Sequence, residues 1–339
     1  MGSLFYFLVL WFIPLSGPSL HTESMQPIAV PPDTAATMVF AGDLNLSYRF
    51  EQYVGTQTDY AFSRLKSIGA FDVMMANLEN PVTSSTDSVD KDFVFRMQPR
   101  YLPIIKRAGI SVVNCANNHT GDFGREGIIE TVRDLDTAGI LHTGAGNTLA
   151  EARKPVILRI HGKTIGILGY GGNGIHYAGE HCAGTVPGEK AIMVGDIRSL
   201  RKNVDLVVVN IHWGEECAEM PNDRQIQLGH ALIDAGADLI IGHHPHVPQG
   251  IERYKNGVIA YSLGNFVFGG NGHDINSETF VMKVEVTAGG WHYEPVPVVV
   301  NRWQPGQADS AAAHRILSLV AARSTMLNTH LASQSRSSL

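Results

Sequence analysis

The sequence predicts an α/β protein built on a largely parallel β-sheet. Short apolar runs with the length of buried strands alternate along the chain with segments of helical spacing, which is the pattern of strands joined by crossover helices. Five of the apolar runs also end in polar side chains. Ligand sites on such sheets form at the carboxyl ends of the strands, so this second observation favours the same fold class.

The composition is that of a globular protein with a substantial core. Of the 339 residues, 44% are hydrophobic and 17% are charged, which is ordinary for a globular protein. The length is enough for one large domain or two smaller ones. The formal net charge of -6 provides no basic surface, so we expect no nucleic-acid partner. The cysteines form no dense disulfide framework: Cys115 is expected to be buried and free, and a pairing of Cys182 with Cys217 stays open.

The chain begins with an apolar segment over residues 1–20. Its run from 4 to 15 is too short to span a bilayer comfortably and has the length of a signal-peptide core, although no Lys or Arg precedes it. We expect an exported protein that is periplasmic, extracellular or anchored to the membrane by this segment; an apolar extension or a mis-assigned start is the alternative. Residues 21–36 are typical of a linker, 37–305 of the main domain, and 306–339 of a C-terminal helix and tail.

The first half of the main domain contains three predicted strands separated by helical segments. The strands are apolar runs at 37–44, 70–78 and 110–115. The helical segments lie at 59–68, 101–108 and 126–138, and each is followed by glycine. Residues 83–92 are rich in Ser, Thr and Asp and are predicted to form a mobile loop.

The second half contains two predicted hairpins, which turn at His161-Gly162 and at Asn256-Gly257 and extend over 156–170 and 251–267. Further strands are expected at 204–211, 239–241 and 279–300, and helices at 223–235 and 314–326. Residues 171–190 are Gly-rich and long for a loop, which indicates a lid or a binding wall.

The stretch from Ala237 to His246 is the most informative part of the sequence. A short apolar strand runs directly into a glycine and three histidines, His243, His244 and His246. Neutral imidazole is the commonest protein ligand of transition metals, and Pro245 holds the residue before it in an extended conformation. A histidine-rich surface loop is the alternative interpretation.

The other apolar strands end in residues of the same chemical kind, namely Asp43, Glu79, Asn118-His119 and His212. Each alone has an ordinary explanation, such as a turn or a helix cap. Because the carboxyl ends of parallel strands meet at one edge, their conjunction predicts a metal site. Oxygen and nitrogen ligands suit Mn, Fe or Zn better than Ca or Mg, and a carboxylate such as Glu79 can bridge two ions.

These motifs together resemble the signature of a known family. The matching residues are Asp43-x-Asn45, Asn77-Leu-Glu79, Asn117-Asn-His119-x-x-Asp122-Phe-Gly124, His212-Trp-Gly-x-Glu216, Gly242-His-His-Pro-His246 and Ser262-Leu-Gly-Asn-Phe266. Over about residues 37–270 they are similar to the capsule synthesis CapA proteins, which are associated with poly-γ-glutamate capsule formation and resemble calcineurin-like metallophosphoesterases in fold. The resemblance implies a β-sandwich flanked by helices, in four layers (αββα).

The resemblance also implies roles for individual residues. The implied ligands of one or two divalent ions are Asp43, Asn45, Glu79, Asn118, His212, His244 and His246. His119 matches the proton donor, while Asp122, Glu216 and Asn265 are expected to support the ligands. Asn45 stands where the phosphoesterases usually have a metal histidine, and Glu79 where they have a bridging aspartate. For Asp122 a helix cap is an equal alternative, and for Glu216 a solvated side chain.

The leading hypothesis is an exported metal-dependent hydrolase of the phosphoesterase type, acting on an anionic substrate or polymer in capsule or poly-γ-glutamate biosynthesis. Two alternatives stay open. The asparagine at position 45, in place of a metal histidine, and the apolar N-terminus favour a non-catalytic accessory subunit of a membrane polymer synthase. The third hypothesis is a poly-γ-glutamate hydrolase, in which the same site attacks an amide.

Overall fold

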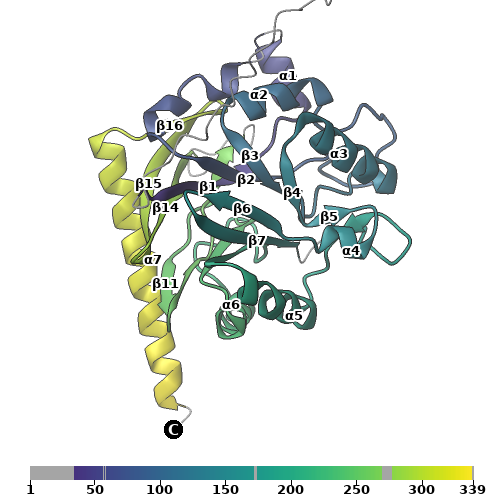
Figure 1. The fold of residues 1–339 in the computed structure, drawn as a ribbon. Helices are drawn as coiled ribbons and strands as arrows, with labels where there is room; N and C mark the ends of the chain where they lie inside the picture. Colours follow the sequence, from purple (N-terminus) through teal and green to yellow (C-terminus); the bar gives the residue numbers. More distant parts are fainter. Residues whose placement is uncertain (1–33, 56, 58, 172–173, 269–276, 338–339) are drawn as a thin grey trace, which may run out of the picture. The chain divides into compact units, whose positions relative to one another are not determined.

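The computed structural model describes residues 34–55, 57, 59–171, 174–268 and 277–337 (Figure 1). The predicted export segment 1–20 and most of the predicted linker 21–36 lie outside these residues. The described chain enters its first strand at Ala36. Among the described helices, none combines the length and the apolar character that crossing a membrane requires.

The first sheet has eight strands in the order β16-β15-β14-β1-β2-β3-β4, with β13 also paired to β1. Its parallel part consists of β1 (Ala36–Leu44), β2 (Val73–Leu78), β3 (Ile110–Asn114), β4 (Leu141–Thr143) and β13 (Asn265–Val267). Its antiparallel part consists of β14 (Glu278–Thr287), β15 (Gly290–Asn301) and β16 (Gln304–Gln307).

The second sheet has six strands in the order β11-β12-β10-β9-β7-β6. The four central strands run parallel and are β7 (Lys163–Gly171), β9 (Leu206–His212), β10 (Leu239–His243) and β12 (Gly257–Ala260). The antiparallel edge strands are β6 (Val156–Ile160) and β11 (Ile251–Tyr254). A separate pair joins β5 (Ala145–Gly146) to β8 (Gly184–Thr185).

The two sheets pack face to face because their strands carry apolar residues on both faces. Met38 and Phe40 point into the core between the sheets, where Val208 and Ile241 of the second sheet meet them. Val39, on the other face of β1, packs under the first helical layer. Sheets in which both faces are covered by packed elements have strands of this continuously apolar kind.

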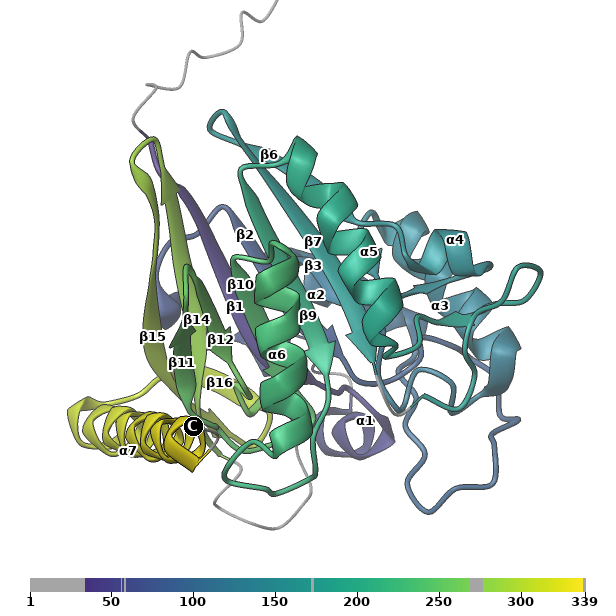
Figure 2. The same ribbon diagram turned by 90° about the horizontal axis from the view of Figure 1, so that it is seen from below.

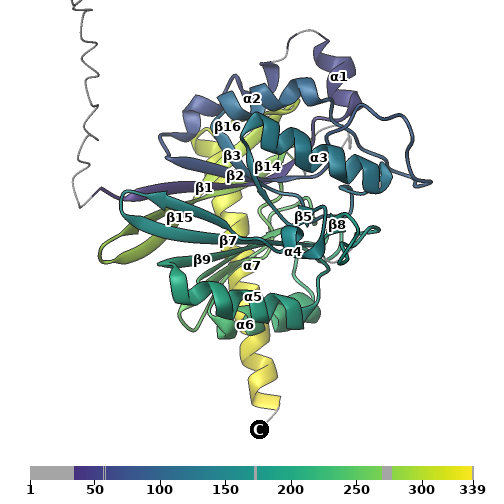
Figure 3. The same cartoon turned by 45° about the vertical axis from the view of Figure 1, so that its right-hand side comes forward.

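Helices cover the outer faces and complete the four layers that the sequence predicts (Figure 3). The outer core of the first sheet includes residues of α2 (Leu102–Arg107) and α3 (Gly124–Ala138). The outer core of the second sheet includes residues of α5 (Lys190–Leu200) and α6 (Asp223–Ala235). Shorter helices are α1 (Tyr48–Val54) and α4 (Leu149–Ala152).

The C-terminal helix α7 (Ser310–Ser337) is longer than the predicted 314–326 and lies beside β11, β14 and β15 (Figures 1 and 2). Ile316 and Val320 belong to the core between the sheets, and Leu327 belongs to the outer core of the second sheet. The helix therefore seals one edge of the sandwich.

Two predictions of local structure are wrong, and one helix was not predicted. Residues 59–68 form two short 3-10 helices, Tyr60–Phe62 and Leu65–Ile68, rather than one α-helix. The hairpin predicted over 251–267 ends at Ala260, and β13 crosses to the first sheet, where Asn265 pairs with Asp43. In the described part of the Gly-rich segment 171–190, β8 pairs with β5, and α5, which the sequence did not predict, follows it. These outcomes depend on tertiary pairing, which local spacing does not encode.

The cysteines are free thiols, with Cys115 buried as predicted, Cys182 partly buried and Cys217 exposed.

Candidate metal centre

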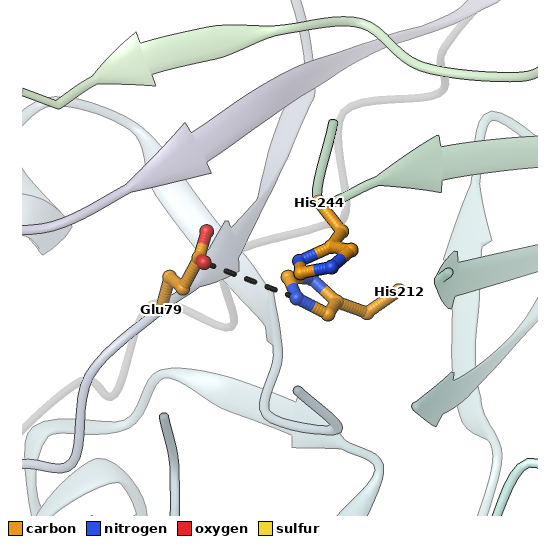
Figure 4. A group of neighbouring side chains, drawn as sticks. All are labelled: Glu79, His212 and His244. Carbon is orange, nitrogen blue, oxygen red and sulfur yellow. Dashed lines mark ion pairs between the residues drawn. The ribbon is translucent and has the colours of Figure 1, made fainter. Parts of the chain in front are cut away.

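Polar side chains from both sheets lie close together at the carboxyl ends of the strands. Asp43 and Glu79 come from the ends of β1 and β2, and both carboxylates have 0% exposure. His212 ends β9, and His244 and His246 follow β10. In Figure 4 the carboxylate of Glu79 faces the imidazoles of His212 and His244, and its Oε1 lies 3.9 Å from Nε2 of His212. The sandwich thus brings together residues that are remote in the sequence.

These side chains form three overlapping groups of potential ligands, in each of which the ligand atoms lie within 4.8 Å of one another. The groups are Asp43, Glu79 and His246; Glu79, His212 and His244; and Glu216, His244 and His246. Glu79 is shared by the first two groups. A carboxylate has two oxygens, so Glu79 can serve two neighbouring ion positions at once.

Asn77 holds the centre of this cluster, a role that the sequence did not reveal. Its Nδ2 donates to Oδ1 of Asp43 at 2.8 Å and lies 3.3 Å from Nδ1 of His212. Its Oδ1 accepts from Nδ2 of Asn114 at 3.0 Å. The signals available were its place in the motif Asn77-Leu-Glu79 and its position as an amide within an apolar run, since buried amides need partners.

The segment after β10 has a strained backbone. The φ angles of His244 and His246 are 98° and 59°, in the left-handed region that non-glycine residues rarely adopt. The expectation that Pro245 holds His244 in an extended conformation is therefore wrong, because the surrounding structure overrides this local preference. Each such residue costs on the order of 1–3 kcal/mol and persists only when its surroundings hold it there. Strain of this kind concentrates at functional sites, which agrees with a site built on this segment.

Neighbouring side chains fix the ring of His246. Its Nδ1 lies 2.9 Å from Oδ1 of Asn265 and 3.3 Å from Oδ2 of Asp43, while Nε2 lies 3.6 Å from Oε1 of Glu79. Ligand histidines usually donate the other ring N–H to an oxygen, which orients the ligating nitrogen. Asn265 reaches this position because β13 pairs with β1 opposite Asp43.

His243, to which the sequence assigned no role, also contacts Asp43. Its Nδ1 lies 3.4 Å from Oδ1 of Asp43, and its Nε2 lies 3.3 Å from Oδ1 of Asn210. His243 is buried, with 1% exposure. His243 therefore helps to hold the carboxylate of Asp43 in place.

Burial dominates the electrostatics of the cluster. It raises the pKa of Glu79 well above its usual value, and the charge of Asp43 adds to the effect. Burial also raises the pKa of Asp43, but contacts with His243 and His246 outweigh it and leave that pKa well below the usual value. In the absence of a cation, the pKa values of the two carboxyls are therefore shifted in opposite directions.

The surroundings also shift the pKa values of the histidines in opposite directions. Burial and the neighbouring His244 hold the pKa of His212 well below 6.5, and burial together with His246 lowers the pKa of His244 to about 4. Burial lowers the pKa of His246 as well, but the charges of Glu79 and Asp43 overcome it and raise that pKa to about 10. His212 and His244 are thus neutral at pH 7, the form in which imidazole binds a metal, whereas His246 would have to release its proton to an ion that it binds.

The residues present fit a divalent ion. Oε1 of Glu79 is buried and accepts no hydrogen bond from the described residues. A buried acceptor without a partner is costly, and a cation bound by Glu79, Asp43 and the neutral imidazoles would satisfy it. Carboxylate and imidazole ligands favour a transition metal such as Mn, Fe or Zn.

The structure uses Asn118 and Asn45 differently. Oδ1 of Asn118 lies 2.8 Å from Nε2 of His212, within the cluster. The side chain of Asn45 is instead engaged with the backbone: Nδ2 donates to the carbonyl of Glu79 at 3.2 Å, and Oδ1 accepts from the N–H of Ser47 at 2.9 Å. Asn45 braces the segment that carries Glu79, and its role as a ligand stays a prediction.

His119 lies beside the cluster in a fixed orientation. Its Nδ1 is 2.7 Å from Oδ2 of Asp122, and its ring packs on Phe95 with a centroid distance of 4.2 Å. Asp122 does not cap α3, whose N-cap residue is Phe123, so the capping alternative is wrong. The carboxylate of Asp122 instead orients His119.

Lys91 is a further member of this site that the sequence did not predict. Its Nζ donates to Oδ1 of Asp122 at 3.0 Å and to the carbonyl of Asn118 at 2.9 Å. Lys91 thus anchors the segment 83–92, which was predicted to be a mobile loop, to the site. No local pattern marks Lys91, because its partners lie on a different strand end.

Glu216 lies at the solvent side of the cluster. It is exposed, yet its carboxylate lies within reach of His244 and His246. Glu216 therefore lies near the ligand histidines, where it was expected to support them.

The fold and this cluster define a class: an α/β sandwich protein with a carboxylate–imidazole centre between the carboxyl ends of its two sheets. Residues 37–270 match the family model described as bacterial capsule synthesis protein PGA_cap. The chain therefore belongs to that family, and the predicted resemblance is confirmed.

Three named proteins are similar to this chain in sequence. The chain is 34% identical over 282 residues to the PGA biosynthesis protein CapA of Bacillus subtilis, covering 80% of this chain and 74% of that protein. It is 33% identical over 262 residues to the capsule biosynthesis protein CapA of Bacillus anthracis, covering 73% and 63%. It is 30% identical over 236 residues to a probable polyglutamine synthesis accessory protein of Mycobacterium tuberculosis, covering 64% and 62%. The chain thus spans less than two thirds of the last two proteins.

Among solved structures, a 5'-nucleotidase from Candida albicans aligns with a TM-score of 0.43 at 10% identity, covering 86% of this chain and 58% of that chain. The protein TT1561 of Thermus thermophilus aligns with a TM-score of 0.40 at 11% identity, covering 77% and 99%.

Proposed function

We propose that this protein is an exported, metal-dependent hydrolase of the phosphoesterase type that acts in capsule or poly-γ-glutamate biosynthesis. One observation carries the catalytic part: buried Glu79 is shared by two groups of potential ligands, and its Oε1 has no hydrogen-bond partner among the described residues. The names of the relatives, which refer to PGA and capsule biosynthesis, support the polymer context.

Two neighbouring ion positions would be held by this chain. Asp43, Glu79 and His246 would supply one, and Glu79, His212 and His244 the other, with Asn118 next to His212. Divalent ions so bound lower the pKa of water and stabilise negative charge on the oxygens of a reacting phosphoryl or acyl group.

His119 would move the proton in this reaction. Asp122 accepts the Nδ1 hydrogen and stabilises the imidazolium, so that Nε2 can deliver a proton to the leaving oxygen of the substrate. Burial lowers the pKa of His119, and the hydrogen bond and charge of Asp122 oppose this shift by stabilising the protonated ring. A general acid of this kind contributes on the order of 10²–10⁴-fold in rate.

Two phenylalanines would restrict water around the reacting groups. Phe95 packs on His119, and Phe268 packs on His246 with a centroid distance of 4.7 Å. The two rings also meet each other edge to face at 5.7 Å. Apolar walls strengthen the electrostatic interactions of the site by excluding solvent.

A second candidate is a non-catalytic accessory subunit of a membrane polymer synthase. The observation in its favour is Asn45, whose amide is engaged with the backbone at Glu79 and Ser47. Backbone contacts therefore hold the amide of Asn45 at the position where the phosphoesterases usually have a metal histidine. In this case the cluster would serve binding or folding, and the N-terminal segment would place the protein at the membrane.

Assays of the purified full chain with added Mn²⁺ separate these functions. The substrates are a generic aryl phosphate and poly-γ-glutamate, and the matched variants are His244→Ala and His292→Ala, which changes an exposed histidine paired with Glu285. Phosphate-ester turnover that is lost only in His244→Ala supports the phosphoesterase. Release of glutamate oligomers instead indicates a polymer hydrolase. No turnover on either, with copurifying membrane proteins, indicates the accessory role and contradicts the hydrolase proposal.

A further inference from the structure

Arg323 of α7 occupies an unusual position. Among the lysines and arginines whose side chains the structure describes, it is the one that is buried, with 4% exposure. Long basic side chains are almost never buried unless they are paired. Arg323 lies outside the range 37–270 that the family model matches, and it contacts segments inside that range.

Its guanidinium joins two segments that bear residues of the metal centre. One nitrogen donates to the carbonyl of Pro248, two residues after His246. Another nitrogen lies 2.9 Å from Oε1 of Glu219, three residues after Glu216. A single side chain of the C-terminal helix therefore ties the histidine segment to the segment that carries Glu216.

The backbone of α7 also seats directly on the histidine segment. The N–H of Ile251 donates to Oγ of Ser324 at 2.8 Å. A Cβ on Gly250 would lie 3.0 Å from the backbone of Arg323 and Ser324, so the helix approaches as closely as a glycine permits. The two segments also bond to each other, from the N–H of Cys217 to the carbonyl of Pro245 at 2.9 Å.

The histidine segment needs such support because its backbone is strained. His244 and His246 have left-handed φ angles of 98° and 59°, which neighbouring structure must hold in place. Pro248 and Gly250 follow immediately, and both contact α7.

We propose that Arg323 is a positioning residue for the metal centre, holding His244, His246 and Glu216 in register from the C-terminal helix. The proposal rests on the proposed metal-dependent function. Groups that orient ligands without touching the ion typically change metal affinity by about 10–100-fold when removed. Arg323 would act in this way on two segments at once.

The test uses the full chain with Arg323→Met, which keeps an apolar stem in the buried position, and Arg323→Lys, which can keep one of the two contacts. Arg315→Met is the control, because Arg315 lies on the same helix but is exposed and pairs only with Glu278 in the described structure. Hydrogen exchange of the metal-free proteins and Mn²⁺ affinity by calorimetry are measured for each.

We expect Arg323→Met to raise amide exchange in residues 213–219 and 243–251 and to weaken Mn²⁺ binding about 10-fold or more. Arg323→Lys should recover part of both, and Arg315→Met should leave both at wild-type values. A role in overall stability alone would raise exchange throughout the protein and leave the affinity of the folded protein unchanged, which would overturn the inference. If Arg323→Met does not fold, Glu219→Gln replaces it and should weaken binding in the same direction.

Failure of this inference differs from failure of the proposed function. Wild-type protein that binds no Mn²⁺ would overturn the metal-dependent function and the positioning role with it. Wild-type binding together with unchanged affinity in Arg323→Met would overturn the positioning role alone.

Discussion

Oδ2 of Asp43 lies 3.3 Å from Nδ1 of His246, so the end of β1 in one sheet is paired with the segment after β10 in the other. Both side chains are buried, at 0% and 6% exposure. The site therefore exists only when the two sheets are packed together. It follows that an ion bound there would stabilise the sandwich itself.

Metal binding should raise the stability of the fold, and Asp43→Asn should remove most of this effect. A ligand at about 100 times its dissociation constant adds about 2.7 kcal/mol to the free energy of unfolding. Thermal unfolding in a chelator and in excess Mn²⁺ measures the difference. The control is Asp59→Asn, which changes an exposed aspartate with 74% side-chain exposure. An equal metal shift in Asp43→Asn and wild type would count against Asp43 as a ligand.

In the metal-free protein, His244 and His246 should each contribute most to stability near neutral pH. As pH falls from about 6.5 to about 4, the unfolded chain takes up a proton on His244 that the folded protein refuses, so stability falls by about 3 kcal/mol from this residue. As pH rises from about 6.5 to about 10, the unfolded chain releases a proton that folded His246 keeps, so stability falls again.

Urea unfolding of chelated protein across this pH range checks the prediction. His244→Gln should flatten the acid side, with His212 supplying the remaining slope because its pKa is also well below 6.5. His292→Gln is the control. Glu79, whose raised pKa makes stability fall as pH rises, opposes this slope in wild type and variant alike, so the comparison between them isolates His244. An acid slope as steep in His244→Gln as in wild type would show that His244 is not buried in its neutral form.

Lys91→Met should weaken the fold and raise the pKa of His119. The substitution removes a charged hydrogen bond from the fully buried Asp122, which costs on the order of 1–2 kcal/mol for a partner with 27% exposure. Burial lowers the pKa of His119, and the charge of Lys91 lowers it further, so that pKa should rise without the lysine. Chemical denaturation and an NMR titration of His119 measure the two effects.

The matched control for this variant is Lys106→Met, whose exposed lysine donates to the carbonyl of Ala138. Its effect on stability should stay within about 0.5 kcal/mol. A His119 pKa that is the same in Lys91→Met and wild type would separate Lys91 from the proton-transfer site.

Gly42→Ala should disrupt the crossing of β13 to the first sheet. A Cβ at residue 42 would lie 1.9 Å from the carbonyl oxygen of Gly264, so β1 and the segment before Asn265 could not approach as they do. We expect a loss of more than about 2 kcal/mol in the free energy of unfolding. Gly195→Ala is the control, since a Cβ there meets no atom within 4 Å in α5 and should stabilise by about 0.5–1 kcal/mol. Equal stabilities in the two variants would contradict this description.

The sequence was sufficient to predict the convergence of Asp43, Glu79, His212 and the histidine segment, because parallel strands share one carboxyl edge. It could not assign a role to Asn77, which it noted only as part of a motif, and it did not identify Lys91. Asn77 lies within an apolar run, and Lys91 lies in a polar stretch whose partners are set by tertiary packing alone. Arg323 was equally hidden, because helical spacing does not reveal what the inward face of α7 contacts.

The segments that were predicted wrongly share a physical cause. The apolar alternation over 251–267 does not show that β13 leaves the hairpin for the other sheet, because a strand segment fits either sheet by local pattern. Helical spacing in 59–68 likewise does not distinguish an α-helix from the two 3-10 turns that form.

The most direct test of the proposed metal centre is the metal content of the full chain, expressed without a histidine tag and measured by elemental analysis beside His244→Ala. We predict about two divalent ions per wild-type chain, since Glu79 belongs to two groups of ligands, and fewer in the variant. Wild-type protein that retains no ion, even after incubation with Mn²⁺, would contradict the proposed centre.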